Sequence, residues 1–164
     1  MTTYRQLEAR DFSSVATIVT TDFEALYAYK RGDYQRCLQL STQNVHTLLY
    51  AVRMHRVSTF PIEFLQLMDD DIVSLTALTL IVSPECRHDD DSNVRVCQLT
   101  LSLYLMTQCQ LKLHHSVTSL AQTLDYIEVG RTRTPDDDRP TLDHLTLKLT
   151  ERKILIYLSN NMQS

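Results

Sequence analysis

The sequence from Ala25 to Leu38 reads ALYAYKRGDYQRCL. Small and apolar side chains recur at three- and four-residue steps on both sides of Gly32, which is the spacing of one face of an α-helix. Gly32 can adopt the left-handed conformation that ends a helix, and Asp33 can cap the helix that follows. Because only three residues join them, the two predicted helices have to run antiparallel. This stretch therefore predicts a helix hairpin.

The helical spacing continues in both directions from this turn. Upstream, the predicted buried face passes through Val15, Ile18, Val19, Phe23, Leu26, Tyr27 and Lys30. Downstream, it passes through Tyr34, Cys37, Leu38, Ser41, Val45, Leu48, Leu49 and Val52. The first predicted hairpin thus covers residues 15–55.

A second hairpin is predicted over residues 93–129. Its first helix would be capped by Ser92 or Asn93 and would end near Lys112, and the second would follow an apolar stripe from Leu113 to Ile127. Residues 130–140 have the composition of a loop. A C-terminal helix over 141–160 would then cap the end of the stack, with a buried edge at Leu142, Leu145, Leu149 and Ile156.

The segment between the two hairpins gives less regular signals. Ser58 to Pro61 looks like a new helix start with proline in its first turn, leading into a short helix over 62–68. The aspartates at 69–71 suit the N-terminal end of another helix, over 72–82, because the helix dipole favours negative charge there. Residues 85–92 are predicted to form an exposed loop.

Composition points to the same fold class. Only two of the 164 residues are glycine and four are proline. β-Sandwiches and barrels need many tight turns that glycine supplies, and a dinucleotide-binding fold needs a glycine-rich first loop. Helix hairpins need few glycines, and this length fits one domain with its own core. We therefore expect one all-α domain, 1–164, of about six to seven helices in stacked antiparallel hairpins.

One segment favours a strand instead. Leu99, Leu101, Leu103 and Leu105 alternate with polar residues, and alternation is typical of a half-buried strand. However, no turn residue interrupts the segment before Lys112, and a leucine-rich helix suits burial on several sides. Helix is the preferred interpretation, and a strand over 99–105 stays open as the alternative.

Charge and cysteine usage bear on partners and location. The net charge is −4 and no basic stripe is visible, which disfavours a nucleic-acid partner. The longest apolar-rich stretch, 72–82, is far shorter than the ~20 residues that cross a bilayer. Cys37, Cys86, Cys97 and Cys109 form no C-x-x-C pair, which suits a reducing compartment. We expect a soluble cytoplasmic protein with no membrane partner.

The first hairpin carries a family pattern. Ala25 and Cys37 place small side chains where two helices would cross closely, Gly32 marks the turn, and the aromatic Tyr34 follows it. This arrangement resembles a tetratricopeptide repeat. A weaker copy lies over 93–129, where Ser119-Leu120 parallels Cys37-Leu38. The residues expected to pack the repeats are Ala25, Gly32, Tyr34, Cys37, Leu38, Ser119 and Leu120.

The resemblance is incomplete. Residues that depart from the family pattern are Thr21, Glu24, Ser41, Asn44 and Leu49. No regular 34-residue period runs through the chain either. In this alignment Asp22 and Leu26 occupy positions where some family members carry a carboxylate clamp, which argues against recognition of an acidic chaperone tail.

The resemblance implies a concave surface that binds proteins or peptides. Tyrosine is favoured at binding surfaces, and the groove is expected to be lined by Tyr29, Tyr50, Arg53 and Arg56. We therefore expect a non-catalytic adaptor that binds a protein or peptide and needs no cofactor. One alternative is a homodimer formed through the leucine-rich face at 99–105. A second is an enzyme whose site assembles from scattered residues in a deep pocket.

Metal and catalytic patterns are weak. Cys86 and His88 stand beside three aspartates. Structural zinc usually takes two spaced pairs of ligands, and no second cysteine or histidine pair follows at a sequence spacing typical of zinc sites. His114 and His115 are adjacent, so on a helix they would point about 100° apart. No phosphate-binding loop, nucleophile elbow or zinc-protease motif occurs. The sequence predicts no metal site and no catalytic residue.

Overall fold

The computed structural model describes residues 21–51, 59–60, 70–82, 96–133 and 140–163. Six α-helices lie in these ranges: residues 21–30, α2 (Tyr34–His46), α4 (Asp70–Val82), α5 (Gln98–Lys112), α6 (Val117–Arg133) and α7 (Thr141–Met162). A π-helical turn, η1 (Thr47–Ala51), follows α2, and β1 (Thr59–Phe60) pairs antiparallel with β2 (Val96–Cys97). The predicted all-α class is confirmed.

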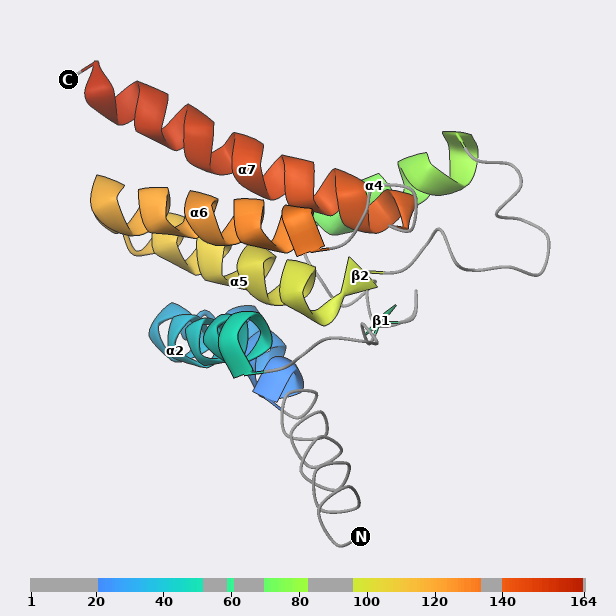
Figure 1. The fold of residues 1–164 in the computed structure, drawn as a ribbon, viewed down its shortest axis with the longest axis horizontal. Coiled ribbons are helices and arrows are strands. Elements are labelled where there is room, and N and C mark those ends of the chain that lie inside the picture. The colour runs from blue at the N-terminus through green and yellow to red at the C-terminus, as the bar shows by residue number, and fades with distance from the viewer. Residues whose placement is uncertain (1–20, 52–58, 61–69, 83–95, 134–139, 164) are drawn as a thin grey trace, which may run out of the picture.

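Helix α5 lies at the centre of the molecule. Every residue from Gln98 to Gln110 is buried, and in Figure 1 the helix runs between α2 on one side and α7 on the other. Helix α6 also packs against it. A helix covered on all sides needs no polar face, which explains why its leucines show no single stripe. The helical interpretation is confirmed, and the strand alternative for 99–105 is wrong.

Burial of α5 also bears on self-association. Leu99 is 6% exposed and Leu101, Leu103 and Leu105 are 1% exposed or less. The chain's own helices cover these side chains. The leucine-rich face is therefore not available to a second copy, and a homodimer would need another surface.

The predicted turn after the first helix is confirmed. Gly32 has a φ of 78°, and its N–H donates to the Tyr29 carbonyl at 3.0 Å. The Asp33 N–H donates to the Ala28 carbonyl at 2.9 Å, and the Asp33 carboxylate accepts from the Arg36 N–H at 3.2 Å. Glycine ends one helix without strain and aspartate caps the next.

The buried face of residues 21–30 agrees with the predicted one at Leu26 but not at Phe23 and Tyr27. Ala25, Leu26 and Ala28 are 4% exposed or less, whereas Phe23 and Tyr27 are 50% and 63% exposed. The polar residue Asp22 lies on the buried face, bonded to α2 and α5. Small side chains allow the helix to approach its neighbours closely, so the large aromatic residues remain outside.

The residues expected to pack the repeats are mostly internal. Those that are buried are Ala25, Cys37, Leu38 and Leu120. Tyr34 and Ser119 are half-buried, and Gly32 lies in the turn. Among the labelled elements of the described residues, α2 packs most extensively against α5.

Helix α7 extends over the predicted C-terminal segment. Its predicted buried edge is confirmed at Leu142, half-buried at Leu145 and Leu149, and wrong at Ile156. Its buried residues are Leu142, Asp143, Thr146, Leu147, Thr150 and Ile154. Ile156, predicted to be buried, is 51% exposed. The hydroxyls of Thr146 and Thr150 donate to the carbonyls of Leu142 and Thr146, at 2.8 and 2.7 Å. Threonine can thus be buried with its polar group satisfied, and a prediction based on apolar residues alone missed this face.

Gly130 was predicted to begin a loop, but it lies inside α6 and is buried. A Cβ atom at this position would lie 3.1 Å from Cδ2 of Leu99. The glycine is thus explained by close packing of α6 on α5, not by a turn. Helix α6 ends at Arg133, and Pro140 directly precedes α7.

The start of α5 also differs from the prediction. The helix begins at Gln98, where Cys97 is the cap and its Sγ accepts from the Thr100 N–H at 3.4 Å. Thr59 and Phe60, expected to start a helix, pair with β2 instead. The Cys97 N–H donates to Asp143 of α7 at 2.8 Å, so a contact across 46 residues helps to fix this end.

Helix α4 confirms the predicted helix over 72–82 and begins two residues earlier, with Asp70 and Asp71 in its first turn. Several other predictions fall outside the described residues: the chain before residue 21, the helix over 62–68, the loop over 85–92 and most of the loop over 130–140. Among the described helices, none combines the length and apolar character needed to cross a bilayer.

Candidate functional site

The predicted groove residues do not form one described surface. Tyr29 is half-buried and meets Tyr34 edge to face, with ring centroids 5.7 Å apart. Tyr50 is 73% exposed and lies in η1, beyond the opposite end of α2. Arg53 and Arg56 fall outside the described residues. Tyr50 is therefore the predicted groove residue that the structure places most openly at the surface.

Asp22 and Leu26, which the repeat resemblance aligns with clamp positions, are buried. Asp22 and Leu26 are 0% and 4% exposed. Asp22 Oδ1 accepts from Asn44 Nδ2 at 2.7 Å and from Ser102 Oγ at 2.9 Å. Because Ser102 belongs to α5, this face of the first helix packs into the core and offers no surface to a peptide.

An aromatic cluster surrounds the exposed Tyr50. We define it as His46, Tyr50 and Tyr126. The His46 ring lies between the other two, with centroids 6.1 Å from Tyr50 and 5.6 Å from Tyr126, and both pairs meet edge to face. His46 Nε2 and the Tyr126 hydroxyl are hydrogen-bonded at 3.0 Å. These distances and angles are favourable for aromatic pairs, so the cluster is a defined surface feature.

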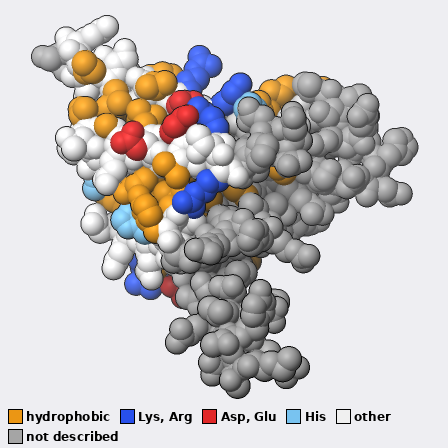
Figure 2. Space-filling view, viewed as in Figure 1, with side chains coloured by type: hydrophobic (Ala, Val, Ile, Leu, Met, Phe, Trp, Pro, Cys, Tyr) orange, Lys and Arg blue, Asp and Glu red, His pale blue; other side chains and the backbone are white. Residues whose placement is uncertain are grey.

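Each side chain of the cluster comes from a defined element. His46 is the last residue of α2, Tyr50 lies in the π-helical turn, and Tyr126 lies on α6. Tyr126 is 7% exposed and forms the floor, while His46 and Tyr50 face solvent. π-Helical turns are rare and occur frequently at functional sites. Figure 2 shows hydrophobic side chains gathered beside histidine side chains on one face of the molecule.

The polar groups at the cluster are held in place. Burial, with a smaller contribution from Tyr50, raises the pKa of the Tyr126 phenol. The Arg133 guanidinium donates to the Leu48 carbonyl at 3.3 Å, which ties the end of α6 to the π-helical turn. Val129, on the same helix, is 39% exposed. The site presents aromatic, apolar and cationic groups on a fixed backbone.

Sequence reasoning found Tyr50 but missed its partners. His46 and Tyr50 are four residues apart, a spacing that places both on one side of a helix. That local signal was available. Tyr126 is 80 residues from His46, and nothing in either local sequence indicates the contact.

The catalytic alternative needs a cleft that holds a cysteine or histidine. One cleft of about 580 Å³ lies at the first turn and is lined by Glu24, Tyr27, Ala28, Arg31, Asp33 and Arg36. A groove of about 430 Å³ between α4 and α7 is lined by Leu75, Lys148, Leu149, Glu151, Arg152 and Leu155. Neither contains cysteine or histidine. No group of three metal-ligating side chains occurs in the described residues, and the Cys86–His88 segment lies outside them.

No protein-family model, curated protein or solved structure matches the chain. The resemblance to a tetratricopeptide repeat therefore rests on the residues of the first hairpin and on the weaker copy over 93–129.

Proposed function

We propose that this chain is a non-catalytic adaptor, built on tetratricopeptide-like hairpins, that binds a protein or peptide segment at the aromatic cluster. The observation that carries the proposal is Tyr50, which is 73% exposed and meets His46 edge to face, while His46 is hydrogen-bonded to the buried Tyr126. Tyrosine and arginine are enriched among the residues that dominate binding energy at interfaces. An exposed tyrosine on a rigid support loses little side-chain entropy when a partner covers it.

The polar groups of the cluster suit an extended or turn-forming segment. His46 and the hydroxyls of Tyr50 and Tyr126 offer hydrogen-bonding groups beside aromatic surface. Arg133, which donates to Leu48 in the π-helical turn, adds a charge, and Val129 adds an exposed apolar side chain three residues after Tyr126 on α6. A partner segment with one apolar or aromatic anchor and neighbouring backbone groups would match this combination.

A displayed library of random peptides, selected on the purified chain, tests the proposal. We expect enriched peptides whose affinity, measured by fluorescence anisotropy, falls at least tenfold in a Tyr50→Ala variant. Val117→Ala is the matched control, because Val117 is 48% exposed on α6 and lies outside the cluster. Thermal unfolding of both variants should match the parent chain. Peptides that bind equally well to the Tyr50→Ala variant would refute the proposal.

A further inference from the structure

Helix α4 exposes an apolar face that the described part of the chain leaves uncovered. Its inner side is packed, with Ile72, Thr76 and Thr79 no more than 7% exposed. On its outer side Val73, Leu78 and Ile81 are 41%, 49% and 68% exposed, and the whole helix contains no charged residue after Asp71. A helix that is apolar all round is normally buried on all sides. The outer face of α4 therefore has the composition of an interface.

Helix α7 extends this surface. It packs against α4, and Lys153 bridges to Asp71 of α4 with Nζ and Oδ2 2.6 Å apart. Leu155 and Ile156 on α7 are about half exposed, at 50% and 51%. The groove of about 430 Å³ is lined by residues of both helices, including Leu75 and Leu155. Both helices thus contribute apolar side chains to one groove, and we name this groove with its lining residues the α4–α7 surface.

Positive charge borders this surface. Lys148, Arg152 and Leu155 follow one another at four- and three-residue steps, so they lie on one side of α7. Lys148 and Arg152 line the groove and are exposed. Neither forms an ion pair with a described residue, whereas Lys153 pairs with Asp71 and Arg131 pairs with Glu151. Two cations without partners beside an apolar groove favour an anionic occupant.

We propose that the α4–α7 surface binds an acidic amphipathic helix of another protein. Such a helix would lay its apolar stripe along the groove and direct carboxylates toward Lys148 and Arg152, a recurring mode of helix recognition. A second copy of this chain fits less well. A symmetric dimer pairs the same patch with itself, and this would bring the two cations of one copy close to those of the other.

Three synthetic peptides test the assignment on the full chain. All share one leucine stripe at helical spacing and differ only in the flanking residues, which are glutamate, glutamine or lysine. We expect the glutamate peptide to bind at least tenfold more tightly than the other two, as measured by fluorescence anisotropy. The preference should disappear or reverse in a Lys148→Glu, Arg152→Glu double variant, whose exposed substitutions leave the fold intact.

Two apolar variants separate this surface from the rest of the molecule. Leu155→Asp, in the lining of the groove, should abolish binding of the glutamate peptide, while Val117→Asp, at a comparably exposed position on α6, should not change it. Tyr50→Ala should leave binding of the glutamate peptide unchanged. Binding at the α4–α7 surface can therefore be tested separately from binding at the aromatic cluster. Equal binding of all three peptides would overturn the proposal. Light scattering that shows a dimer which Leu155→Asp dissociates would also overturn it, because the occupant of the groove would then be a second copy.

Discussion

His114 occupies, in the turn between α5 and α6, the position that Gly32 occupies in the first turn. Their φ angles are 52° and 78°. The His114 N–H donates to the Leu111 carbonyl at 3.3 Å, and the next N–H donates to the Gln110 carbonyl at 3.0 Å. The N–H groups of Gly32 and Asp33 make the same two bonds to Tyr29 and Ala28. Both helices thus end in a Schellman turn, one with glycine and one with a side chain in the left-handed region.

Replacing His114 by glycine should stabilise the chain. A left-handed conformation costs a residue with a side chain about 1 kcal/mol, and glycine removes that cost. We expect His114→Gly to raise the free energy of unfolding by about 0.5–1 kcal/mol in urea titrations. The matched Gly32→Ala should lower it by about 1 kcal/mol. As a control, His115→Gly should not raise the free energy of unfolding, because His115 has an ordinary φ. A lower free energy of unfolding in His114→Gly would contradict the left-handed conformation of His114.

Gly130 should not tolerate a larger residue. A Cβ at this position already lies 3.1 Å from the end of the Leu99 side chain, and further methyl groups would meet buried α5. We expect Gly130→Val to lower the free energy of unfolding by about 2 kcal/mol, as overpacking does. Ala121→Val places the same residue at an exposed position of α6 and should cost about 0.5 kcal/mol. If both variants lowered the free energy of unfolding by a similar amount, the contact between Gly130 of α6 and Leu99 of α5 would be looser than the structure shows.

The buried carboxyl of Asp22 should make stability depend on pH. Burial raises its pKa to about 7, against the hydrogen bonds from Ser102 and Asn44 that lower it. Between pH 4 and 7 the folded chain therefore holds a proton that the unfolded chain has released. Stability should fall as the pH rises through this window, by at most about 1.4 kcal/mol per pH unit, and the loss should end above pH 7.

Asp22→Asn separates this contribution from those of the other titrating groups. The amide cannot ionise, so the difference in unfolding free energy between the parent chain and the variant should change between pH 5 and pH 7.5. Urea titrations at the two pH values measure it. Parallel changes in the two proteins would mean that Asp22 titrates normally in the folded chain.

The cysteines of the core should be unreactive. Cys37 and Cys109 are 0% exposed and Cys97 is 9% exposed. Burial first, and the Asp143 carboxylate second, raise the pKa of the Cys97 thiol to about 12, and the thiolate is the reactive form. In a Cys86→Ser variant, we expect a disulfide reagent such as Ellman's reagent to modify no thiol at neutral pH until urea unfolds the chain. Rapid modification of native protein would contradict this burial.

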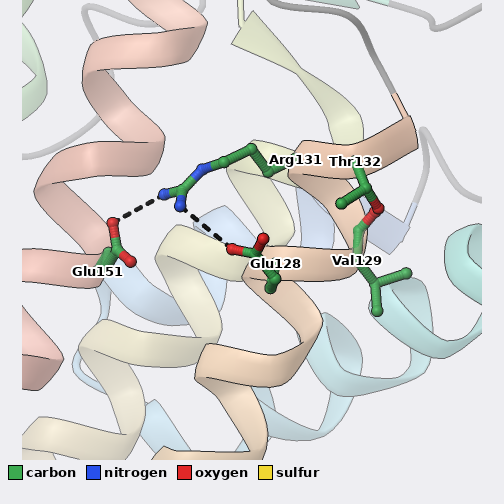
Figure 3. Close-up of polar contacts among 5 residues, drawn as sticks. All are labelled: Glu128, Val129, Arg131, Thr132 and Glu151. Atoms are coloured by element: carbon green, nitrogen blue, oxygen red, sulfur yellow. Dashed lines mark hydrogen bonds and ion pairs between the residues drawn. The ribbon is translucent and has the colours of Figure 1, made fainter.

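Arg131 should stabilise the contact between α6 and α7. Its guanidinium lies 2.7 Å from Glu151 of α7 and 3.2 Å from Glu128 of its own helix (Figure 3). The Arg131 and Glu151 side chains are about one-third exposed, which limits screening by solvent. We expect Arg131→Met to cost about 1 kcal/mol of stability, and less in high salt. Arg36→Met is the control, since its 3.6 Å contact with Glu24 is far more exposed and should contribute almost nothing.

The sequence by itself determined the local features of the fold. The turn at Gly32, the Asp33 cap, the end of α5 at Lys112 and the helix over 72–82 all depend on residues within one or two turns of each other. Backbone conformation and capping act over that range, so neighbouring residues carry the signal. The small number of glycines likewise sufficed for the all-α class.

Only the tertiary structure decided which faces are buried and where the candidate sites lie. Thr146 and Thr150 of α7 are buried because their hydroxyls bond to their own helix, while Ile156 points outward. Tyr126 meets His46 across 80 residues. Such contacts depend on how whole helices pack around α5. The face of a helix that becomes buried is decided by side-chain shape and by how closely the helices approach, as well as by hydrophobicity. For this reason the hairpin could be read from its own residues, whereas the aromatic cluster and the α4–α7 surface could not.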